Sequence, residues 1–143
     1  MRALGLDIGS KRIGVAISDQ SGLIGQALET IASTNPERDL RRILEIVRDY
    51  EVTEIVVGLP YNMDGSEGPQ VDKVRKFMDL IAGNVSVPVH GWDERLTTVA
   101  AERALLEADM SRAKRRKLVD KIAAALILQG YLDHRRNEGL FAS

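Results

Sequence analysis

The 143-residue sequence carries 20 basic and 21 acidic side chains, for a formal net charge of −1, and contains no cysteine. This length suffices for a single domain over residues 1–143, and the lack of cysteine excludes disulfides, thiolate metal sites and cysteine nucleophiles. The chain shows no signal-peptide layout, and its longest apolar run, Ile122–Leu128, is far shorter than the roughly 20 residues of a membrane span. We therefore expect a soluble, cytoplasmic protein that makes no contact with a membrane.

Two short strands joined by a tight turn are predicted over Leu4–Asp19. Large and small side chains alternate in both strands, so that one face of the hairpin is bulky and the other is nearly bare. Asp7 projects from the bare face, which leaves room for a metal ion, a phosphate or the backbone of another element. A carboxylate that only caps the turn is the alternative. The turn itself carries two cations, Lys11 and Arg12.

Strands and helices alternate along the rest of the chain. The patterns predict strands over Leu23–Ile31, Glu54–Gly58 and Val85–Trp92, and helices from Asn35 to Tyr50, from Val71 to Ile81, from Thr97 or Thr98 to Met110, and from about Ser111 to Arg136. Three strands in a meander, followed by alternating helices and strands, predict a mixed five-stranded sheet covered by helices. The fold class is therefore α/β, with antiparallel and parallel pairs in the same sheet.

Two regions outside the strands draw interest as binding surfaces. The loop Leu59–Pro69 leaves a strand end and is rich in turn formers, a common place for ligands, although a plain connection is the alternative. The segment between Ser111 and Arg136 contains eight basic and only two acidic side chains. This excess predicts a local basic surface, with a solvated helix face as the alternative. His90 and His134 are isolated in the sequence, and we expect both to be structural or surface residues.

Asp120 interrupts a final helix that is otherwise apolar nearly all round. A lone carboxylate there would lose hydration at a cost of several kcal/mol unless it were paired. Its partner is then Lys121, an arginine of the run Arg112–Lys117, or a cation.

Glu94 stands where a strand ends and a helix begins, a position from which side chains reach into the sites of α/β domains. Asp93 competes for this role, because successive strand side chains point to opposite faces. Three converging acids would favour Mg²⁺ or Mn²⁺, and such a site can activate water and stabilise the leaving oxygen of a phosphodiester. A network of ion pairs is the alternative.

Four segments, in this order, resemble the YqgF family, RuvC-like proteins described as Holliday junction resolvases and as nucleases of precursor ribosomal RNA. They are Asp7–Ala16, Val57–Gly65, Asp93–Thr98 and Asp120–Gln129. The resemblance implies an RNase H-like fold, with Asp7, Glu94 and Asp120 as the catalytic, metal-binding acids, and it selects Glu94 over Asp93. The chain departs from the resolvases proper at Ala123, where they carry a further acidic or histidine ligand one turn after the aspartate. That difference weakens the resolvase interpretation.

The leading hypothesis is a nuclease that depends on Mg²⁺ or Mn²⁺ and cleaves structured RNA, namely the 5′ end of a precursor of 16S ribosomal RNA within ribosome precursors. The side chains expected to hold its substrate are Lys11, Arg12, Asn62, Arg95, Arg115 and Lys117. The alternatives are a resolvase-like nuclease of branched DNA and a non-catalytic factor that binds RNA or the ribosome. An enzyme of the actin and sugar-kinase type would need a second domain, for which the chain is too short.

Overall fold

The computed structural model describes residues 2–96 and 112–141, with the backbone alone over 112–120 and 139–141. The predicted helix between Thr97 and Met110 lies outside these described residues. The described elements are β1 (Ala3–Ile8), β2 (Arg12–Ser18), β3 (Gly25–Ala32), α1 (Pro36–Asp49), β4 (Glu54–Leu59), α2 (Pro69–Ala82), β5 (Val89–Asp93), the 3-10 turn η1 (Glu94–Leu96) and α4 (Arg112–Phe141). No helix among the described residues is long and apolar enough to cross a membrane.

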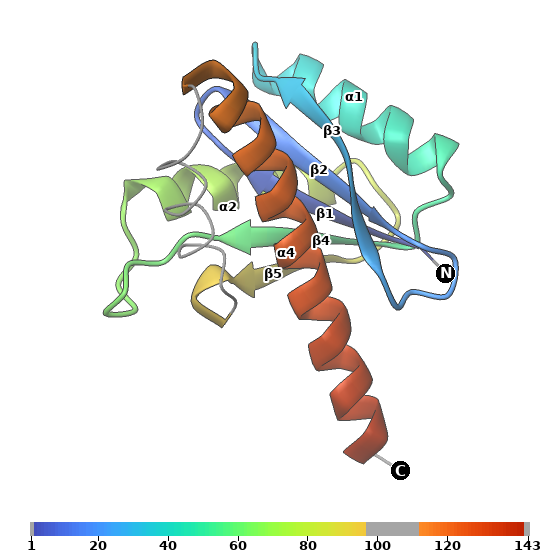
Figure 1. Cartoon of the computed structure of the whole chain (residues 1–143). Helices are drawn as coiled ribbons and strands as arrows, with labels where there is room; N and C mark the ends of the chain where they lie inside the picture. The colour runs from blue at the N-terminus through green and yellow to red at the C-terminus, as the bar shows by residue number, and fades with distance from the viewer. Residues whose placement is uncertain (1, 97–111, 142–143) are drawn as a thin grey trace.

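The strands form one mixed sheet in the order β3-β2-β1-β4-β5. The pairs β1/β2 and β2/β3 are antiparallel, whereas β1/β4 and β4/β5 are parallel. Helices α1 and α2 cover one face, and the long helix α4 crosses the other and extends beyond the sheet (Figure 1). The predicted mixed five-stranded sheet with flanking helices is thus confirmed.

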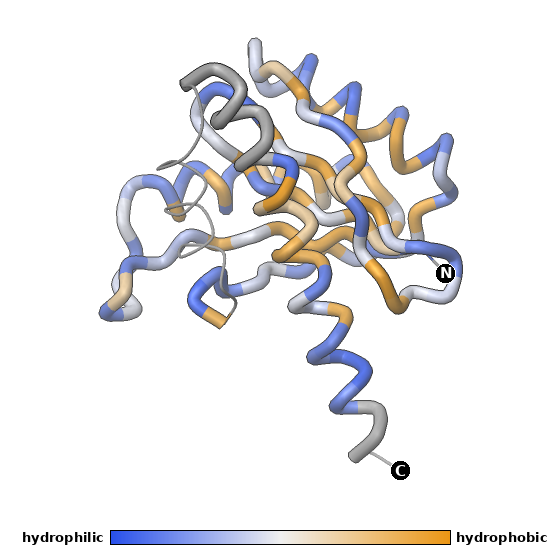
Figure 2. The backbone as a smooth tube through the Cα atoms, in the orientation of Figure 1, coloured by the Kyte–Doolittle hydropathy of each residue, from blue (hydrophilic) through white to orange (hydrophobic). Residues whose placement is uncertain are grey.

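Alternating side-chain size in the strands gives each face of the sheet its own partner. Large residues such as Leu4 and Leu6 join the core beneath α1 and α2, while small ones face α4. A Cβ on Gly5 would lie 2.7 Å from Leu128 Cβ, so α4 rests almost directly on the backbone of β1. Figure 2 shows the result, with hydrophobic central strands, a hydrophobic stretch of α4 over the sheet, and a hydrophilic stretch where α4 projects beyond it.

The last strand is shorter than predicted, beginning at Val89 instead of Val85. Pro88 explains the boundary, because it has no N–H to donate to a sheet ladder. Its carbonyl accepts a hydrogen bond from the Ile55 amide at 2.9 Å, which leads the chain into the parallel pairing with β4. Strand β5 lies at one edge of the sheet.

The third strand also begins later than predicted, at Gly25 instead of Leu23. The carboxylate of Asp19 accepts hydrogen bonds from the amides of Leu23 and Ile24, at 2.9 and 3.2 Å, and so draws both residues into the turn. Their side chains are exposed. An Asx-type turn has therefore replaced the first two residues of the expected strand.

Candidate active site

Asp7 lies near the carboxyl end of β1, on the face of the sheet covered by α4. Gly5, two residues earlier on the same face, touches α4 directly. Asp7 pairs with Gly14 of β2, and the register that aligns Leu6 with Val57 places Gly58 of β4 beside Asp7 on the other side. The residue is only 7% exposed. A buried carboxylate is thus flanked in both neighbouring strands by residues without side chains.

Glu94 reaches the same face from the end of β5. It opens the η1 turn directly after the strand and is 8% exposed. Its Cγ lies 3.3 Å from the position that a Cβ on Gly58 would occupy. Glu94 and Asp7 therefore come from the carboxyl ends of parallel strands on either side of Gly58. This edge is where α/β sheets commonly bind ligands.

The third predicted acid, Asp120, belongs to the helix that crosses this face. Ala124 and Ile127 of α4 pack against Gly5 and Gly58, respectively. Asp120 precedes Ala124 by one helical turn and so belongs to the same stripe of α4. Its side chain and the pairing predicted for it lie outside the described residues. Among the side chains that are described, no three His, Cys, Asp or Glu residues gather closely enough to hold a metal ion.

Asp93, the competitor of Glu94, is engaged by the residue two positions along the chain. Arg95 donates to both of its carboxylate oxygens, with Nη2 2.7 Å from Oδ2 and Nε 3.1 Å from Oδ1. The Arg95 side chain lowers the pKa of Asp93, and the carboxylate in turn raises the pKa of Arg95. The geometry gives Asp93 a positioning role toward Arg95 and leaves Glu94 on the face shared with Asp7.

The loop between β4 and α2 is attached to this edge through Tyr61. The guanidinium carbons of Arg95 and Arg75 lie 5.6 and 5.8 Å from the centre of the Tyr61 ring. Arg75 also pairs with Glu67 at 2.7 Å, and this interaction raises its pKa. Both arginines thus stack on the same aromatic ring while each holds its own carboxylate.

Asn62, predicted to contact substrate, shapes this loop. Its side-chain amide donates a hydrogen bond to Ser66 Oγ at 2.9 Å, and its backbone carbonyl accepts one from the Gly65 amide at 2.8 Å. Gly65 has a φ of +88°, which favours glycine. Ser66 also donates to Asp64 and lowers the pKa of that carboxyl. Asn62 is exposed, but its amide nitrogen is committed to the turn.

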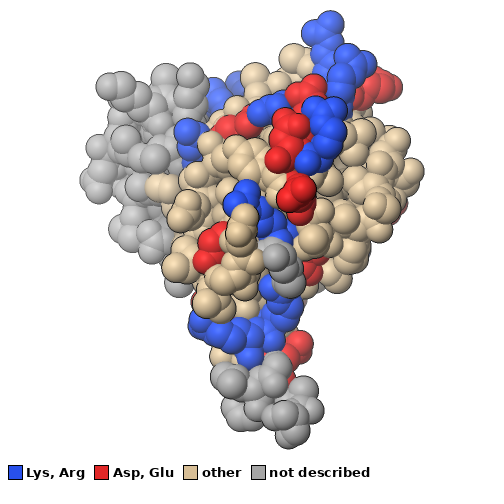
Figure 3. Space-filling view, turned by 90° about the vertical axis from the view of Figure 1, so that its right-hand side faces the viewer, with Lys and Arg blue, Asp and Glu red and all other residues tan. Residues whose placement is uncertain are grey.

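The predicted cationic residues divide between described and undescribed parts of the chain. Lys11 is exposed and Arg12 partly exposed in the turn beside Asp7, which is closed by a 2.9 Å hydrogen bond from the Gly9 amide to the Arg12 carbonyl. The side chains of Arg115 and Lys117 lie outside the described residues. Figure 3 shows basic and acidic side chains intermingled on the face toward the right of Figure 1.

The family model described as "RuvX: Holliday junction resolvase" matches residues 1–134. The chain belongs to the RuvX family. A relative from Symbiobacterium thermophilum named "Putative pre-16S rRNA nuclease" is 58% identical over 135 residues, which cover 94% of each chain. A relative of the same name from Thermoanaerobacter pseudethanolicus is 54% identical over 139 residues, covering 96% of this chain and 100% of its own.

Solved structures show the same fold at low sequence identity. Thermus thermophilus RuvC superposes with a TM-score of 0.59 at 18% identity, covering 96% of this chain and 97% of its own. The fowlpox virus Holliday junction resolvase gives a TM-score of 0.57 at 18% identity, covering 94% and 99%. These similarities confirm the predicted RNase H-like fold. The RuvX match confirms the predicted family and, with it, the prediction of an enzyme that hydrolyses phosphodiester bonds in nucleic acid.

A polar cluster at the opposite end of the RuvX sheet was missed by sequence reasoning. Glu54, which opens β4, is buried and accepts hydrogen bonds from Arg135 and from the Tyr131 hydroxyl, the latter at 3.1 Å. His90 stacks on Tyr131 with ring centroids 5.4 Å apart and approaches Glu54 at 3.6 Å. His134 pairs with Glu138, one helical turn further along α4, at 3.0 Å. Both histidines thus contact other side chains, although they are isolated in the sequence.

Proposed function

We propose that this RuvX protein is a divalent-metal-dependent nuclease that processes the 5′ end of precursor 16S ribosomal RNA. One observation carries the proposal: two buried carboxylates, Asp7 and Glu94, lie on one face of the sheet at the ends of β1 and β5, on either side of Gly58 in the intervening strand β4. The names of the relatives support the choice of RNA, because "Putative pre-16S rRNA nuclease" is given to proteins that align over nearly their full length.

The chemistry of these side chains fits Mg²⁺ or Mn²⁺. Both ions prefer carboxylate and water oxygens, and a cation offsets the repulsion between converging carboxylates. Asp7 and Asp120 would hold the ion, while Glu94 would complete its shell or orient the attacking water. A divalent ion at such a position supplies Lewis-acid polarisation of the phosphoryl oxygen and lowers the pKa of bound water.

Substrate binding in this proposal relies on cations around the same edge. Lys11 and Arg12 would hold the phosphate backbone from the turn beside Asp7, and Arg115 and Lys117 would do so from the start of α4. Such contacts are strong, salt-sensitive and independent of sequence. Asn62 would act from a loop whose turn its side chain stabilises, and Arg95 from the η1 turn, where Asp93 holds it. Part of their effect on substrate binding is therefore structural.

Cleavage of a precursor 16S transcript by the purified protein tests the proposal. Asp7→Asn, Glu94→Gln and Asp120→Asn should each lower the rate by about 100-fold or more, because a neutral amide replaces a charged ligand. Asp79→Asn is the matched control, since it removes the charge of an exposed carboxylate on α2 that has no role in the proposed site. Chelation with EDTA should abolish cleavage, and added Mg²⁺ or Mn²⁺ should restore it.

The same preparations distinguish the alternatives. Equal activity in the wild type and the three acid variants would refute the assignment of the site. Faster, metal-dependent cleavage of a four-way DNA junction than of the transcript would favour the resolvase function that the family description names. Tight RNA binding without metal-dependent turnover would indicate a non-catalytic factor associated with ribosome precursors.

A further inference from the structure

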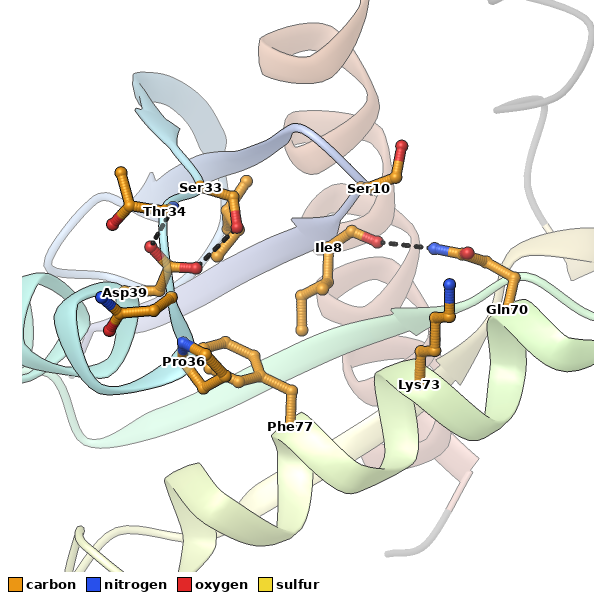
Figure 4. A pocket seen from close by; sticks show the side chains of 12 residues that line it. Ile8, Ser10, Ser33, Thr34, Pro36, Asp39, Gln70, Lys73 and Phe77 are labelled. Carbon is orange, nitrogen blue, oxygen red and sulfur yellow. Dashed lines mark hydrogen bonds between the residues drawn. The ribbon is translucent and has the colours of Figure 1, made fainter.

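A cavity of about 280 Å³ opens beside the turn that follows Asp7. It lies between the β1–β2 turn, the start of α1 and the first turns of α2 (Figure 4). Ile8 lines it, and strand side chains alternate, so the cavity is on the opposite face of the sheet from Asp7. Gly9 and Ser10 form part of its rim. The cavity and the candidate active site therefore share one turn of the chain.

The lining has an acceptor on one side and donors on the other. Asp39 is 5% exposed, and its carboxylate accepts hydrogen bonds from Ser33 Oγ at 2.6 Å and from the Thr34 amide at 3.2 Å. Lys73 and Gln70 stand on the opposite side, and the amide of Gln70 donates to the Ile8 carbonyl at 3.3 Å. Figure 4 shows Asp39 on one side and Lys73 on the other.

Apolar groups occupy the space between these polar sides. The side chains of Ile8 and Phe77 lie between Asp39 and Lys73 in Figure 4, and Pro36 lies next to Phe77. An apolar floor with a few polar groups at its margins is typical of small-molecule sites, in which the polar groups fix the orientation of the ligand. The volume is slightly below the roughly 300–1,000 Å³ of pockets for drug-sized molecules, so a ligand of the size of a single base is favoured.

The charges decide between ligand classes. Glu37 and Asp39 lie in the first turn of α1, which disfavours a phosphate at that helix start. A ligand must instead offer N–H donors to Asp39 and acceptors to Lys73. Guanine offers a carboxylate two adjacent donors, N1–H and N2–H₂, and also presents O6 and N7 as acceptors, which are the atoms that lysine and arginine most often contact. Adenine, cytosine and uracil each have only one N–H-bearing nitrogen on that edge and so cannot bind a carboxylate through two adjacent donors.

We propose that this cavity binds a guanine base of the substrate strand, near the phosphodiester that is cleaved. The proposal rests on the nuclease function above, because it treats the cavity as a subsite of that active site. A strand held at Asp7 would cross the Gly9–Arg12 turn, and the base of a neighbouring nucleotide would then enter the cavity. Backbone contacts alone carry no sequence information, so this base would set a preference for where the strand is cut.

Nucleotide binding to the full chain tests the cavity directly. GMP, AMP, CMP and UMP are titrated into ¹⁵N-labelled protein, and the amide signals of Ser10 and of residues 33–39 are followed by NMR. GMP should shift these signals at the lowest concentration. Lys73→Ala should raise the Kd for GMP about tenfold, whereas Lys76→Ala, a matched change of an exposed lysine on α2, should leave it unchanged. The cavity assignment fails if no nucleotide shifts these signals or if both variants behave alike.

Mapped cleavage sites then separate a base in the strand from a free nucleotide. Wild-type protein should cut a pool of RNA sequences with guanine at a fixed offset from the break, and Lys73→Ala should lose this preference. GMP binding without a guanine preference would overturn the strand assignment in favour of a free-nucleotide site. Cleavage without GMP shifts would overturn the cavity assignment and leave the nuclease intact, while GMP shifts without any cleavage by the wild type would overturn the nuclease and, with it, the subsite.

Discussion

Replacing Gly58 by alanine should disturb both the packing of α4 and the candidate active site. The added Cβ would lie 2.4 Å from Ile127 Cδ1 and 3.3 Å from Glu94 Cγ. The first distance is far inside van der Waals contact, so Ile127 must move, and α4 with it unless the side chain can rotate away. The second is tight enough to displace Glu94 by a few tenths of an ångström.

The magnitude follows from overpacking in a well-filled core. One inserted methyl group that forces such movement lowers the free energy of unfolding by about 1–3 kcal/mol. Each kcal/mol lowers Tm by roughly 2–4 °C in a chain near this size, so a loss of about 2 kcal/mol lowers it by roughly 4–8 °C. Ile127→Val removes the clashing Cδ1 and by itself lowers the free energy of unfolding by about 1 kcal/mol. The double variant should then be hardly less stable than Ile127→Val alone, instead of showing the sum of the two single losses in the free energy of unfolding.

Urea unfolding of the four proteins in this double-mutant cycle gives the coupling energy, expected at about 2 kcal/mol. Gly83→Ala is the control, because its Cβ would meet nothing nearer than 3.5 Å at a φ of −72°. Precursor-RNA cleavage should fall about tenfold in Gly58→Ala and should recover only partly in the double variant, since the contact with Glu94 remains. Stability changes that simply add in the double variant would refute the packing argument. Full activity in Gly58→Ala would refute the role of Glu94.

Three further predictions concern contacts away from Gly58. Arg95→Ala should raise the pKa of Asp93 toward its ordinary value, as measured by carboxyl ¹³C titration; an unchanged pKa would contradict the ion pair. Because the folded-state pKa of Asp93 is lowered, the ion pair stabilises the fold above the unfolded pKa of about 3.9, and the stability gap between wild type and variant should close as the pH falls through the folded pKa. Arg135→Met should lower the free energy of unfolding by about 2 kcal/mol because it leaves Glu54 buried without its cation, and adding Glu54→Gln should recover part of that loss in urea unfolding. Gln129→Ala should lower the free energy of unfolding by about 1–2 kcal/mol, because this side chain hydrogen-bonds to the backbone on both sides of Ile24. Amide hydrogen exchange in the turn before β3 should then become faster, and unaltered exchange would show that the bridge is dispensable.

Local patterns were enough to predict most of the fold and the face of the sheet on which Asp7 lies. The alternation of large and small residues placed Asp7 on the bare face of the first hairpin, and that face is the one that α4 covers. The strand and helix order predicted the mixed sheet, because parallel neighbours require intervening helices. Errors fell at strand ends, where single contacts decide: Asp19 captures two amides before β3, and Pro88 delays β5.

Contacts between distant segments could not be predicted from these patterns. Spacing alone left Asp93 and Glu94 as equals, and only the ion pair with Arg95 and the closeness of Glu94 to Gly58 separate them in space. The partners of Glu54 come from 77 and 81 residues further along the chain, so no local pattern signals this buried cluster. Nor does any periodicity signal the cavity beside Asp39, which three separate elements enclose.

A buried carboxylate lies at each end of β4, Glu54 at its start and Glu94 beside Gly58 at its far end. At its start, Glu54 is neutralised within the protein by Arg135 and is further bonded by Tyr131, both from α4. At its far end, Gly58 leaves room for Ile127 of the same helix and for Glu94. A buried charge is costly unless it is paired, so the ion pair between Glu54 and Arg135 favours stability. Helix α4 contacts both ends of β4. Its contacts with Glu54 therefore help to fix the position of α4 along the sheet, and with it the position of Asp120 relative to the candidate active site.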